Sequence, residues 1–363
     1  MFLLYRVWHF SKRQTKRVFF FLASFPTLAK KRGGFSRAAR LLTYTLIIYG
    51  FDGFKRKCRE VIDDPGDNYN AVSKRQNPLV GCNRPGYVIY APDYRTNSAG
   101  TRCLYLLCDR LNKAGFESYV TWSNKTAGEL IAPIIPIEVA KALVKEDFTA
   151  VYPEVISGNP LGAKNVARWV LNRPGVLGGD KIYHKSEQIF SYSKILNSSI
   201  KNKISGNLYL PTIDETLFFP GDLPAHQRTL ECYYVGKSSW KPGYIDPGKA
   251  FEITSKSPER KDLGKIFRVT KVFFCFDNMT ALVYEAIMCG CPVVLIPDGS
   301  LSRQDFDLYE LSPRGIAWGL DELESARADV AFVKAQYRDV KRLSETQLME
   351  FIAITQERAR ACQ

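Results

Sequence analysis

The stretch Lys271–Gly299, KVFFCFDNMTALVYEAIMCGCPVVLIPDG, constrains the fold of this chain more than any other. Val272–Phe276 and Val293–Ile296 are short apolar runs of residues that favour strands. Between them we expect an amphipathic helix with Asp277 or Asn278 as its N-cap, closed by a Gly-Cys-Pro turn. Two strands joined by one helix form a parallel β-α-β unit. Such sheets bind ligands at the carboxyl ends of their strands.

Two acids in this unit, Asp277 and Glu285, follow an Asp-x7-Glu spacing, and the second continues as Ala-Ile-Met-Cys-Gly-Cys-Pro-Val-Val. This pattern resembles the donor-site signature of family-one and family-four nucleotide-sugar glycosyltransferases, which have the GT-B fold. Their pattern is Glu-x7-Glu, running into Glu-Ala-Met-Ala-x-Gly-x-Pro-Val. Here the first acid is Asp, and Asn278-Met279 replaces the usual Phe-Gly. The alternative interpretation is a capped helix whose Glu285 points to solvent.

The resemblance implies an α/β, GT-B-like fold with two Rossmann-like domains facing across a cleft. It implies that Glu285 accepts hydrogen bonds from the ribose of a nucleotide sugar and that Asp277 lies near the sugar. The remaining donor-binding residues would contact the diphosphate through backbone N–H groups or charge: Gly100, Gly236, Lys237, Asn278, Thr280 and Ala281. The nucleotide sugar is a substrate, and no cofactor is expected.

The first half of the body begins with a predicted strand, Gly86–Ala91, a helix, Thr101–Ala114, and a second strand, Phe116–Trp122. Asp93 and Gly100 lie in the intervening loop. The small Gly100 resembles the loop residue that lets GT-B enzymes bring backbone close to donor phosphates; a plain turn is the alternative.

A third predicted strand, Ala150–Val155, leads to the loop Ser157-Gly158-Asn159-Pro160, and we expect a helix at Ala163–Asn172. The surrounding sequence looks like that of bacterial surface-polysaccharide glycosyltransferases. This implies that Gly158 and Asn159 face the acceptor. Glu154 and Asp93 are candidates for the catalytic base by position, and Glu154 could instead cap a neighbouring helix. Two further strands are predicted, Gln188–Ser193 and Leu208–Leu210.

The second half restarts with a strand at Thr229–Val235, followed at once by Gly236-Lys237. A lysine beside free N–H groups suits a dianion, and a plain surface lysine is the alternative. The Gly-x4-Gly-Lys spacing of a Walker loop is absent from the sequence, which argues against kinase or ATPase chemistry. A strand at Phe251–Thr254 and a helix at Pro258–Val269 are expected before the signature unit, and a helical region at Ala328–Ala361 after it.

The N-terminal sixty residues are cationic and apolar. They hold fourteen Lys or Arg against Asp52 and Glu60, whereas the other 303 residues contribute only +2 to the net charge of +14. Their apolar runs, Phe19–Leu22 and Leu41–Tyr49, are shorter than the roughly 20 residues that span a bilayer. Basic amphipathic segments of this kind lie on anionic membranes. A nucleic-acid-binding arm and helices packed on the first domain are the alternatives.

The predicted organisation has five parts. A basic amphipathic arm at 1–62 and a linker at 63–84 precede an N-terminal acceptor domain at 85–220. A C-terminal donor-binding domain at 221–325 and a helical segment at 326–363, which can cross back to the N-terminal domain, follow.

A metal site is not expected, because the nine cysteines and three histidines show no paired zinc spacing. The one Asp-x-Asp, at Asp305 and Asp307, follows a Gly-Ser-Leu-Ser loop rather than a strand. The cysteines fit buried free thiols in a reducing cytosol.

From these patterns we expect a metal-independent glycosyltransferase. It would move a sugar from a nucleotide-sugar donor to a growing, O-antigen-like or capsule-like glycan, free or lipid-linked. It would be cytoplasmic and peripheral on the anionic inner leaflet, without a nucleic-acid partner. A GT-B-fold nucleotide-sugar epimerase is one alternative. A non-enzymatic adaptor with a degenerate glycosyltransferase body is the other.

Overall fold

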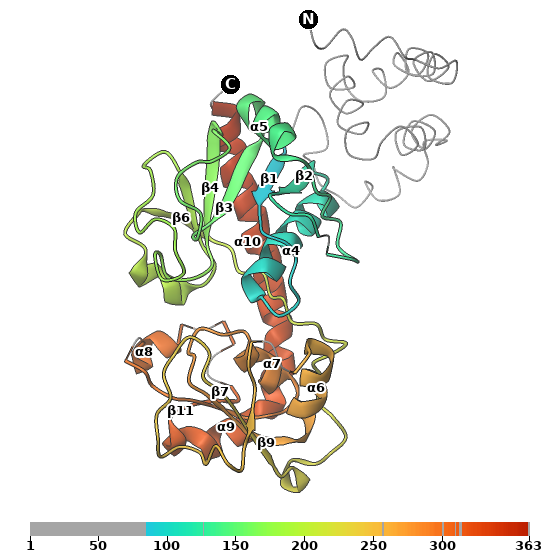
Figure 1. The fold of residues 1–363 in the computed structure, drawn as a ribbon, viewed down its shortest axis with the longest axis vertical. Helices are drawn as coiled ribbons and strands as arrows, with labels where there is room; N and C mark the ends of the chain where they lie inside the picture. The colour runs from blue at the N-terminus through green and yellow to red at the C-terminus, as the bar shows by residue number, and fades with distance from the viewer. Residues whose placement is uncertain are drawn as a thin grey trace, which may run out of the picture. The chain divides into compact units, whose positions relative to one another are not determined.

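A computed structural model describes residues 85–361, apart from positions 126, 256, 257, 300, 309, 312 and 313. The predicted arm at 1–62 and linker at 63–84 lie outside the described residues. Within the described part, two parallel sheets with flanking helices confirm the predicted α/β, GT-B-like fold class (Figure 1). We refer to the two parts as the first half, which holds the first sheet, and the second half, which holds the second.

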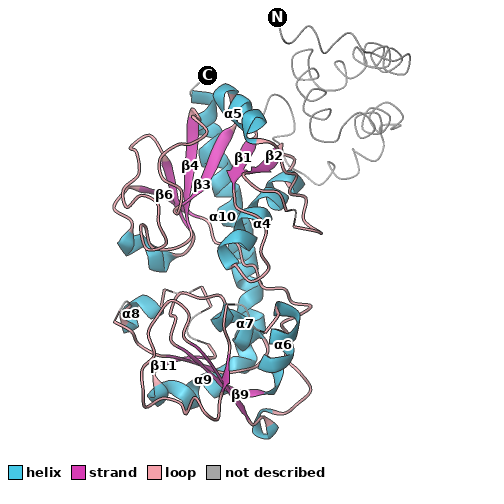
Figure 2. Cartoon of the chain, in the orientation of Figure 1, coloured by secondary structure: helices cyan, strands magenta, loops and turns pink. Residues whose placement is uncertain are grey.

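The first sheet has six strands in the order β2-β1-β3-β4-β5-β6, all parallel (Figure 2). Every residue of the four strands β1 to β4 is buried, as in parallel sheets that are covered on both faces, whereas the residues of the edge strand β6 are half-buried. Its elements are β1 Tyr87–Tyr90, α4 Ala99–Lys113, β2 Ser118–Thr121, α5 Ile137–Glu146, β3 Thr149–Pro153, β4 Asn165–Val170, β5 Gln188–Ser191, η1 Lys194–Ser199 and β6 Ile204–Asn207.

The second sheet has five parallel strands in the order β11-β10-β9-β7-β8. From β8 onward the strands alternate with helices along the chain, which is the pattern that produces parallel sheets. Its elements are η2 Ala225–Gln227, β7 Leu230–Tyr234, β8 Phe251–Glu252, α6 Arg260–Val269, β9 Thr270–Cys275, α7 Leu282–Met288, β10 Val293–Leu295, α8 Arg303–Phe306, β11 Ile316–Trp318, η3 Leu320–Glu322, α9 Leu323–Asp329, η4 Val330–Phe332 and α10 Val333–Ala361.

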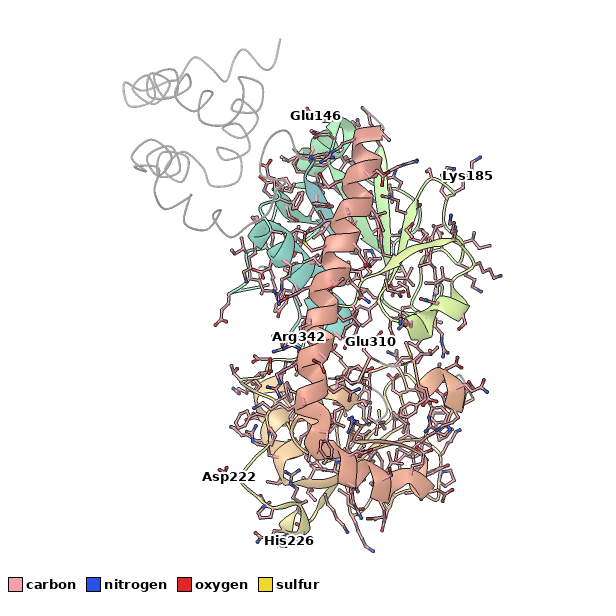
Figure 3. All side chains as sticks on the ribbon, turned by 180° about the vertical axis from the view of Figure 1, so that it is seen from behind. Glu146, Lys185, Asp222, His226, Glu310 and Arg342 are labelled. Atoms are coloured by element: carbon pink, nitrogen blue, oxygen red, sulfur yellow. The ribbon has the colours of Figure 1, made fainter. Side chains whose placement is uncertain are left out.

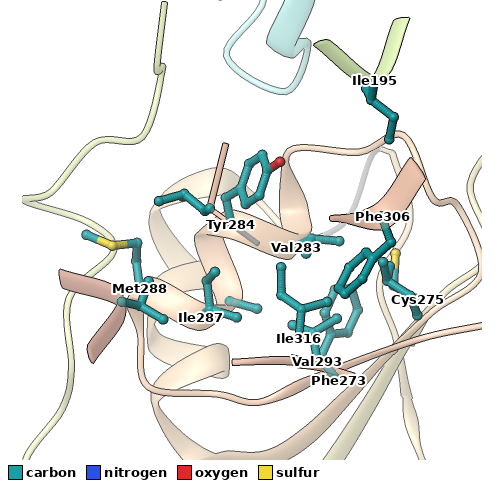
Figure 4. Packing of buried hydrophobic residues seen from close by; sticks show 14 of the residues in the cluster. Ile195, Phe273, Cys275, Val283, Tyr284, Ile287, Met288, Val293, Phe306 and Ile316 are labelled. Carbon is teal, nitrogen blue, oxygen red and sulfur yellow. The ribbon is translucent and has the colours of Figure 1, made fainter. Parts of the chain in front are cut away.

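The core of the second half forms on both faces of its sheet. On one face, Phe273 and Val293 of the strands pack with Val283 and Ile287 of α7 (Figure 4). The strand residues next to these along the chain, such as Phe274 and Val294, point to the other face and form a separate cluster with Ala326 of α9. Because successive strand side chains point to opposite faces, this alternation places helices on both sides of the sheet.

The helix α10 returns to the first sheet and buries Phe351 there. The Phe351 ring meets Phe190 edge to face, with ring centroids 4.7 Å apart. Further along the helix, Thr355 Oγ1 lies 2.8 Å from the Tyr87 hydroxyl, and Gln356 donates to the Pro85 carbonyl over 2.9 Å. Figure 3 shows α10 running from the second half along the first. The helix therefore ties the beginning of the described chain to its end.

Three local predictions are wrong. The segment predicted as a helix at Ala163–Asn172 contains strand β4, because Val166, Trp169 and Val170 favour a strand and every residue of β4 is buried in the middle of the sheet. The buried segment Leu208–Leu210 is not a strand; the Leu208 carbonyl accepts instead from the Trp169 indole. Helix α7 starts four residues after the predicted N-cap Asn278, with the Thr280 hydroxyl accepting from Leu282 N.

The remaining strands and helices of the body match their predictions to within a few residues, including the parallel β9-α7-β10 unit. No prediction had been made for strands β6 and β11 or for helices α5, α8 and α9. Within the described residues, none of the helices combines the length and apolar character needed to cross a bilayer. The six described cysteines are all free and buried.

Candidate functional site

A pocket of about 100 Å³ lies between the two halves of the described chain. A single water needs about 10 to 15 Å³ of such volume, so the pocket has room for several water-sized groups but not for a whole nucleotide sugar. Both halves contribute to its walls. The lining residues are Ala99, Gly100, Cys103, Leu171, Tyr192, Ser193, Ile195, Leu196, Tyr209, Met279, Thr280, Ala281, Tyr284 and Glu310.

The first turn of α4 forms one wall. Ser98 caps this helix, its hydroxyl accepting from Thr101 N at 3.4 Å, so the polar loop after β1 turns directly into the helix. Gly100 lies in the wall, and a Cβ there would come within 3.8 Å of the Leu171 side chain. The predicted donor-site Gly100 is thus a pocket residue.

The loop between β9 and α7 forms the facing wall through Met279, Thr280 and Ala281. Two of these, Thr280 and Ala281, were predicted to bind the donor. The predicted Asn278 is buried beside them and donates to Asp298 Oδ1 over 3.0 Å. This loop follows the carboxyl end of β9, the edge at which α/β sheets bind ligands.

Asp277 lies beneath the same loop and holds two loops together. Its carboxylate accepts from Met279 N at 3.0 Å and from Lys237 N at 3.2 Å. The residue is buried and does not line the pocket. Its position at the end of β9 therefore orders the backbone around the pocket.

The predicted Gly236-Lys237 pair sits directly on Asp277. Gly236 has φ +60°, and a Cβ there would lie 2.6 Å from Asp277 Oδ2, so the close contact of the two loops requires glycine. Lys237 Nζ donates to the Met279 carbonyl over 3.2 Å and lies 3.4 Å from Asp277 Oδ2. The lysine is partly exposed, which leaves its charge accessible next to the pocket wall.

Glu285 is held by two arginines. Its Oε1 accepts from Arg102 of α4 at 2.9 Å and from Arg260 of α6 at 2.5 Å, and Glu285 is only 1% exposed. Arg102 belongs to the first half, so this buried pair joins the two halves. Burial lowers the pKa of Arg260, and the charge of Glu285 opposes that shift.

The Arg102–Glu285–Arg260 cluster is incompletely hydrogen-bonded. Glu285 Oε2, Arg102 Nε and one terminal nitrogen of Arg260 are buried and find no hydrogen-bond partner among the described residues. Leaving such atoms unpaired is costly. Glu285 neither points to solvent nor lines the pocket. Its predicted contact with ribose stays a prediction.

The two candidate bases lie outside the pocket lining. Asp93, after β1, accepts from Asn124 N over 2.6 Å, and this bond lowers the pKa of Asp93. Glu154 is buried after β3 and accepts from Leu171 N over 3.0 Å, so it braces the strand-to-loop junction after β4 rather than a helix. Burial raises the pKa of Glu154 to about 7.

The predicted acceptor-side residues Gly158 and Asn159 bond to side chains of β3, β4 and a later loop. Gly158 N donates to Asp180 Oδ2 at 2.7 Å, and its carbonyl accepts from Arg168, also at 2.7 Å. Asn159 Oδ1 accepts from the Tyr152 hydroxyl at 2.9 Å. Neither residue is in the pocket lining.

Glu310 and Ser193 line the pocket but were missed by sequence reasoning. Glu310 follows α8 in a loop that matches no motif, and Ser193 follows β5, so no spacing links them. The Ser193 hydroxyl donates to Glu310 Oε2 over 2.9 Å. Figure 3 labels Glu310 at the level where the two halves meet. Burial raises the pKa of Glu310 to about 7, opposed by the Ser193 bond.

Metal ligands are not clustered in the part of the chain that the structure describes: no group of three His, Cys, Asp or Glu side chains there could hold an ion. Asp305 accepts from the backbone and hydroxyl of Ser302 as part of a capping box, and Asp307 pairs with Arg303. Both carboxylates of the Asp-x-Asp are therefore engaged locally.

No protein-family model and no curated protein sequence matches this chain. The structure is similar to AviGT4, a glycosyltransferase involved in avilamycin A biosynthesis, with a TM-score of 0.45 and 14% identity, covering 76% of this chain and 97% of that one. It is also similar to sucrose-phosphate synthase from Thermosynechococcus elongatus, with a TM-score of 0.40 and 12% sequence identity, over 76% of this chain and 94% of that one. A third similar structure is an alpha-glucosyltransferase in complex with UDP, with a TM-score of 0.39 and 11% sequence identity, over 72% of this chain and 95% of that one. At these identities and scores, the comparisons assign no activity to this chain.

Proposed function

We propose that this protein transfers a sugar from a nucleotide-sugar donor to a growing cell-surface glycan of the O-antigen or capsule kind. The observation that carries the proposal is the pocket in which the first turn of α4 meets the loop before α7. That loop belongs to the unit with the Asp-x7-Glu signature. Both walls follow the carboxyl ends of parallel strands, β1 and β9, where ligands of such sheets bind.

In this proposal different residues around the pocket bind different parts of the donor. The sugar occupies the pocket, and the diphosphate lies by Lys237 and the backbone around Met279–Ala281. Transfer breaks the bond from the sugar's anomeric carbon to the diphosphate oxygen and forms one to an acceptor hydroxyl, whose proton leaves to a base. Because negative charge develops on the departing diphosphate, the accessible charge of Lys237 stabilises the transition state.

The role proposed for Glu285 has a structural condition. A ribose hydroxyl can donate to the buried Oε2 of Glu285, which lacks a partner among the described residues, while the two arginines keep Oε1. Ribose must still reach an atom that is closed to solvent. Donor binding at Glu285 therefore requires local movement of the cluster that joins the two halves.

The membrane part of the proposal rests on the sequence of the arm. A charge of +12 in sixty residues, interleaved with apolar runs, suits attachment to an anionic inner leaflet from the cytoplasmic side. A lipid-linked acceptor would be presented at the same surface. This proposal includes no nucleic-acid partner.

Calorimetry against a panel of UDP-, GDP-, CMP- and dTDP-sugars tests the donor proposal. We expect one nucleotide class to bind and to raise the melting temperature by mass action. The bound sugar nucleotide should then be consumed only when a glycan acceptor is added, whereas an epimerase would convert it alone. Turnover should persist in EDTA. Absence of binding to every member of the panel, or turnover restored only by manganese, contradicts the proposal.

A further inference from the structure

Glu310 brings a carboxyl group into a pocket whose lining is otherwise mostly apolar. Among the described side chains that line the pocket, only Glu310 is acidic, and none is basic. Leu171, Ile195 and Leu196 supply apolar surface around it. A polar group in such surroundings is costly to bury unless it is hydrogen-bonded. The carboxylate therefore needs partners, and the pocket is where a ligand could provide them.

The known partners of Glu310 do not use its full capacity. The Ser193 hydroxyl donates to Oε2, and backbone groups of Lys194 and of Glu310 itself also hydrogen-bond to the carboxyl group, whereas an ionised carboxylate offers about four acceptor positions. Ser193 is itself fixed, because it follows β5 and its hydroxyl also accepts from Ile195 N. Glu310 is thus held from the opposite half of the molecule in one orientation at the pocket.

The sign of the charge indicates which part of a donor comes near Glu310. A carboxylate repels a diphosphate but accepts from hydroxyl or amino groups. Lys237, an accessible cation near the pocket, bonds instead to the carbonyl of Met279 on the α7 side. Diphosphate and sugar therefore have separate partners.

We infer that Glu310 determines sugar specificity by accepting hydrogen bonds from hydroxyl or amino groups of the donor's sugar, with Ser193 as its positioning residue. The inference rests on the proposed function and adds to it a residue outside the Asp-x7-Glu unit. The chemical class recognised is a sugar that presents hydrogen-bond donors on the edge facing Glu310.

The protonation of Glu310 gives this contact a pH dependence. Burial raises the pKa of Glu310 to about 7; the Ser193 bond and the charge of Lys194 oppose the shift. The neighbouring Tyr192 and Tyr209 stay neutral, because burial raises their pKa values well above 10. Since the carboxylate is the better acceptor, affinity for the sugar should rise as pH passes upward through about 7.

Calorimetry on the full chain separates the sugar contact from nucleotide binding. The probes are the bare nucleotides UDP, GDP, CMP and dTDP, and each is compared with the sugars of the donor panel that carry the same nucleotide. For the pair that the wild-type protein binds, the readout is the ratio of the Kd of the bare nucleotide to that of the nucleotide sugar. Glu310→Gln should lower this ratio about tenfold or more, because a hydrogen bond to a charged group is lost. It should leave the Kd of the bare nucleotide unchanged and remove the pH dependence of the ratio between pH 6 and 8.

Two further variants make the result decisive. Glu324→Gln alters an exposed acid of the same half and should leave the ratio unchanged. Glu310→Asp keeps the charge, but its shorter side chain moves the carboxylate away from the sugar, so this variant should also lower the ratio. It provides the test if Glu310→Gln fails to fold. An unchanged ratio and pH profile in folded Glu310 variants overturns the inference while nucleotide binding, and so the proposed function, stands. Failure of the wild-type protein to bind any nucleotide sugar of this panel overturns both.

Discussion

Two guanidinium groups meet one carboxylate at Glu285, so this buried cluster carries a net positive charge. Buried pairs of this kind add little net stability, since desolvation offsets the attraction. Removing the carboxylate is a different matter, because it leaves the guanidinium groups of Arg102 and Arg260 close together without the acid that both of them contact. The cluster therefore holds the two halves together only while all three side chains are charged.

Glu285→Gln should lower the free energy of unfolding by about 3 to 5 kcal/mol, the usual effect of breaking a buried ion pair from one side. Urea denaturation measures the change. Glu324→Gln, which removes one partner of a surface pair with Arg327, is the matched control and should change stability by less than about 1 kcal/mol. Equal effects of the two variants would show that the charges of Arg102 and Arg260 do not depend on Glu285.

The sequence predicted some pocket residues but not others, for a physical reason. Thr280 and Ala281 belong to a contiguous motif whose β-α-β geometry follows from local periodicity. Glu285 was also found by the motif, but its arginine partners were not: Arg102 lies 183 positions away along the chain. Glu310 and Ser193 come together only when two loops of different halves meet, and one sequence contains no signal for that.

At the level of elements, the correct predictions are those in which periodicity and terminating residues agree. The β9-α7-β10 unit has both. Strand β4 was mistaken for a helix because its apolar run resembled a buried helix in pattern, and only its content of Val and Trp favoured a strand. Helix α5 was overlooked although Val139, Ala140, Leu143 and Val144 form one buried face.

Phe351→Ala should test how much α10 stabilises the first half. The side chain is 1% exposed and packs on Phe190 and Tyr87, so its loss should cost about 3 to 5 kcal/mol. Met349→Ala, at a 43% exposed position of the same helix, is the control and should be nearly neutral. Chemical denaturation compares them. If the two variants are equally stable, α10 does not contribute through this contact.

At the level of the whole molecule, charge and fold are separated along the chain. The near-neutral body contains every proposed donor-site residue, whereas +12 of the net +14 lies in residues 1–60. An activity that depends on the body and a location that depends on the arm should therefore be separable by truncation.

Removing residues 1–60 should abolish binding to anionic vesicles but preserve nucleotide-sugar binding. In the full-length protein, vesicle binding should weaken as salt rises, because screening shortens the reach of exposed charges to about 8 Å at physiological ionic strength. Vesicle co-sedimentation and calorimetry on both forms measure this. A truncated protein that still pellets would refute the membrane role of the arm, and one that unfolds would instead favour helices packed on the first domain.

The return of α10 to the first sheet also has a consequence for how the protein is made. On the ribosome, all six strands of the first sheet emerge before the second half, and α10 emerges after both sheets. Until then, the surface that Phe351 and its neighbours will cover, which includes Phe190 and Tyr87, lacks the helix that packs on it in the described structure. The first half cannot complete its core ahead of the second. Its folding must therefore wait until α10 has been synthesised, whereas the domains of many other multidomain proteins fold one after another. Chaperone demand during synthesis should therefore fall on the half that is translated first.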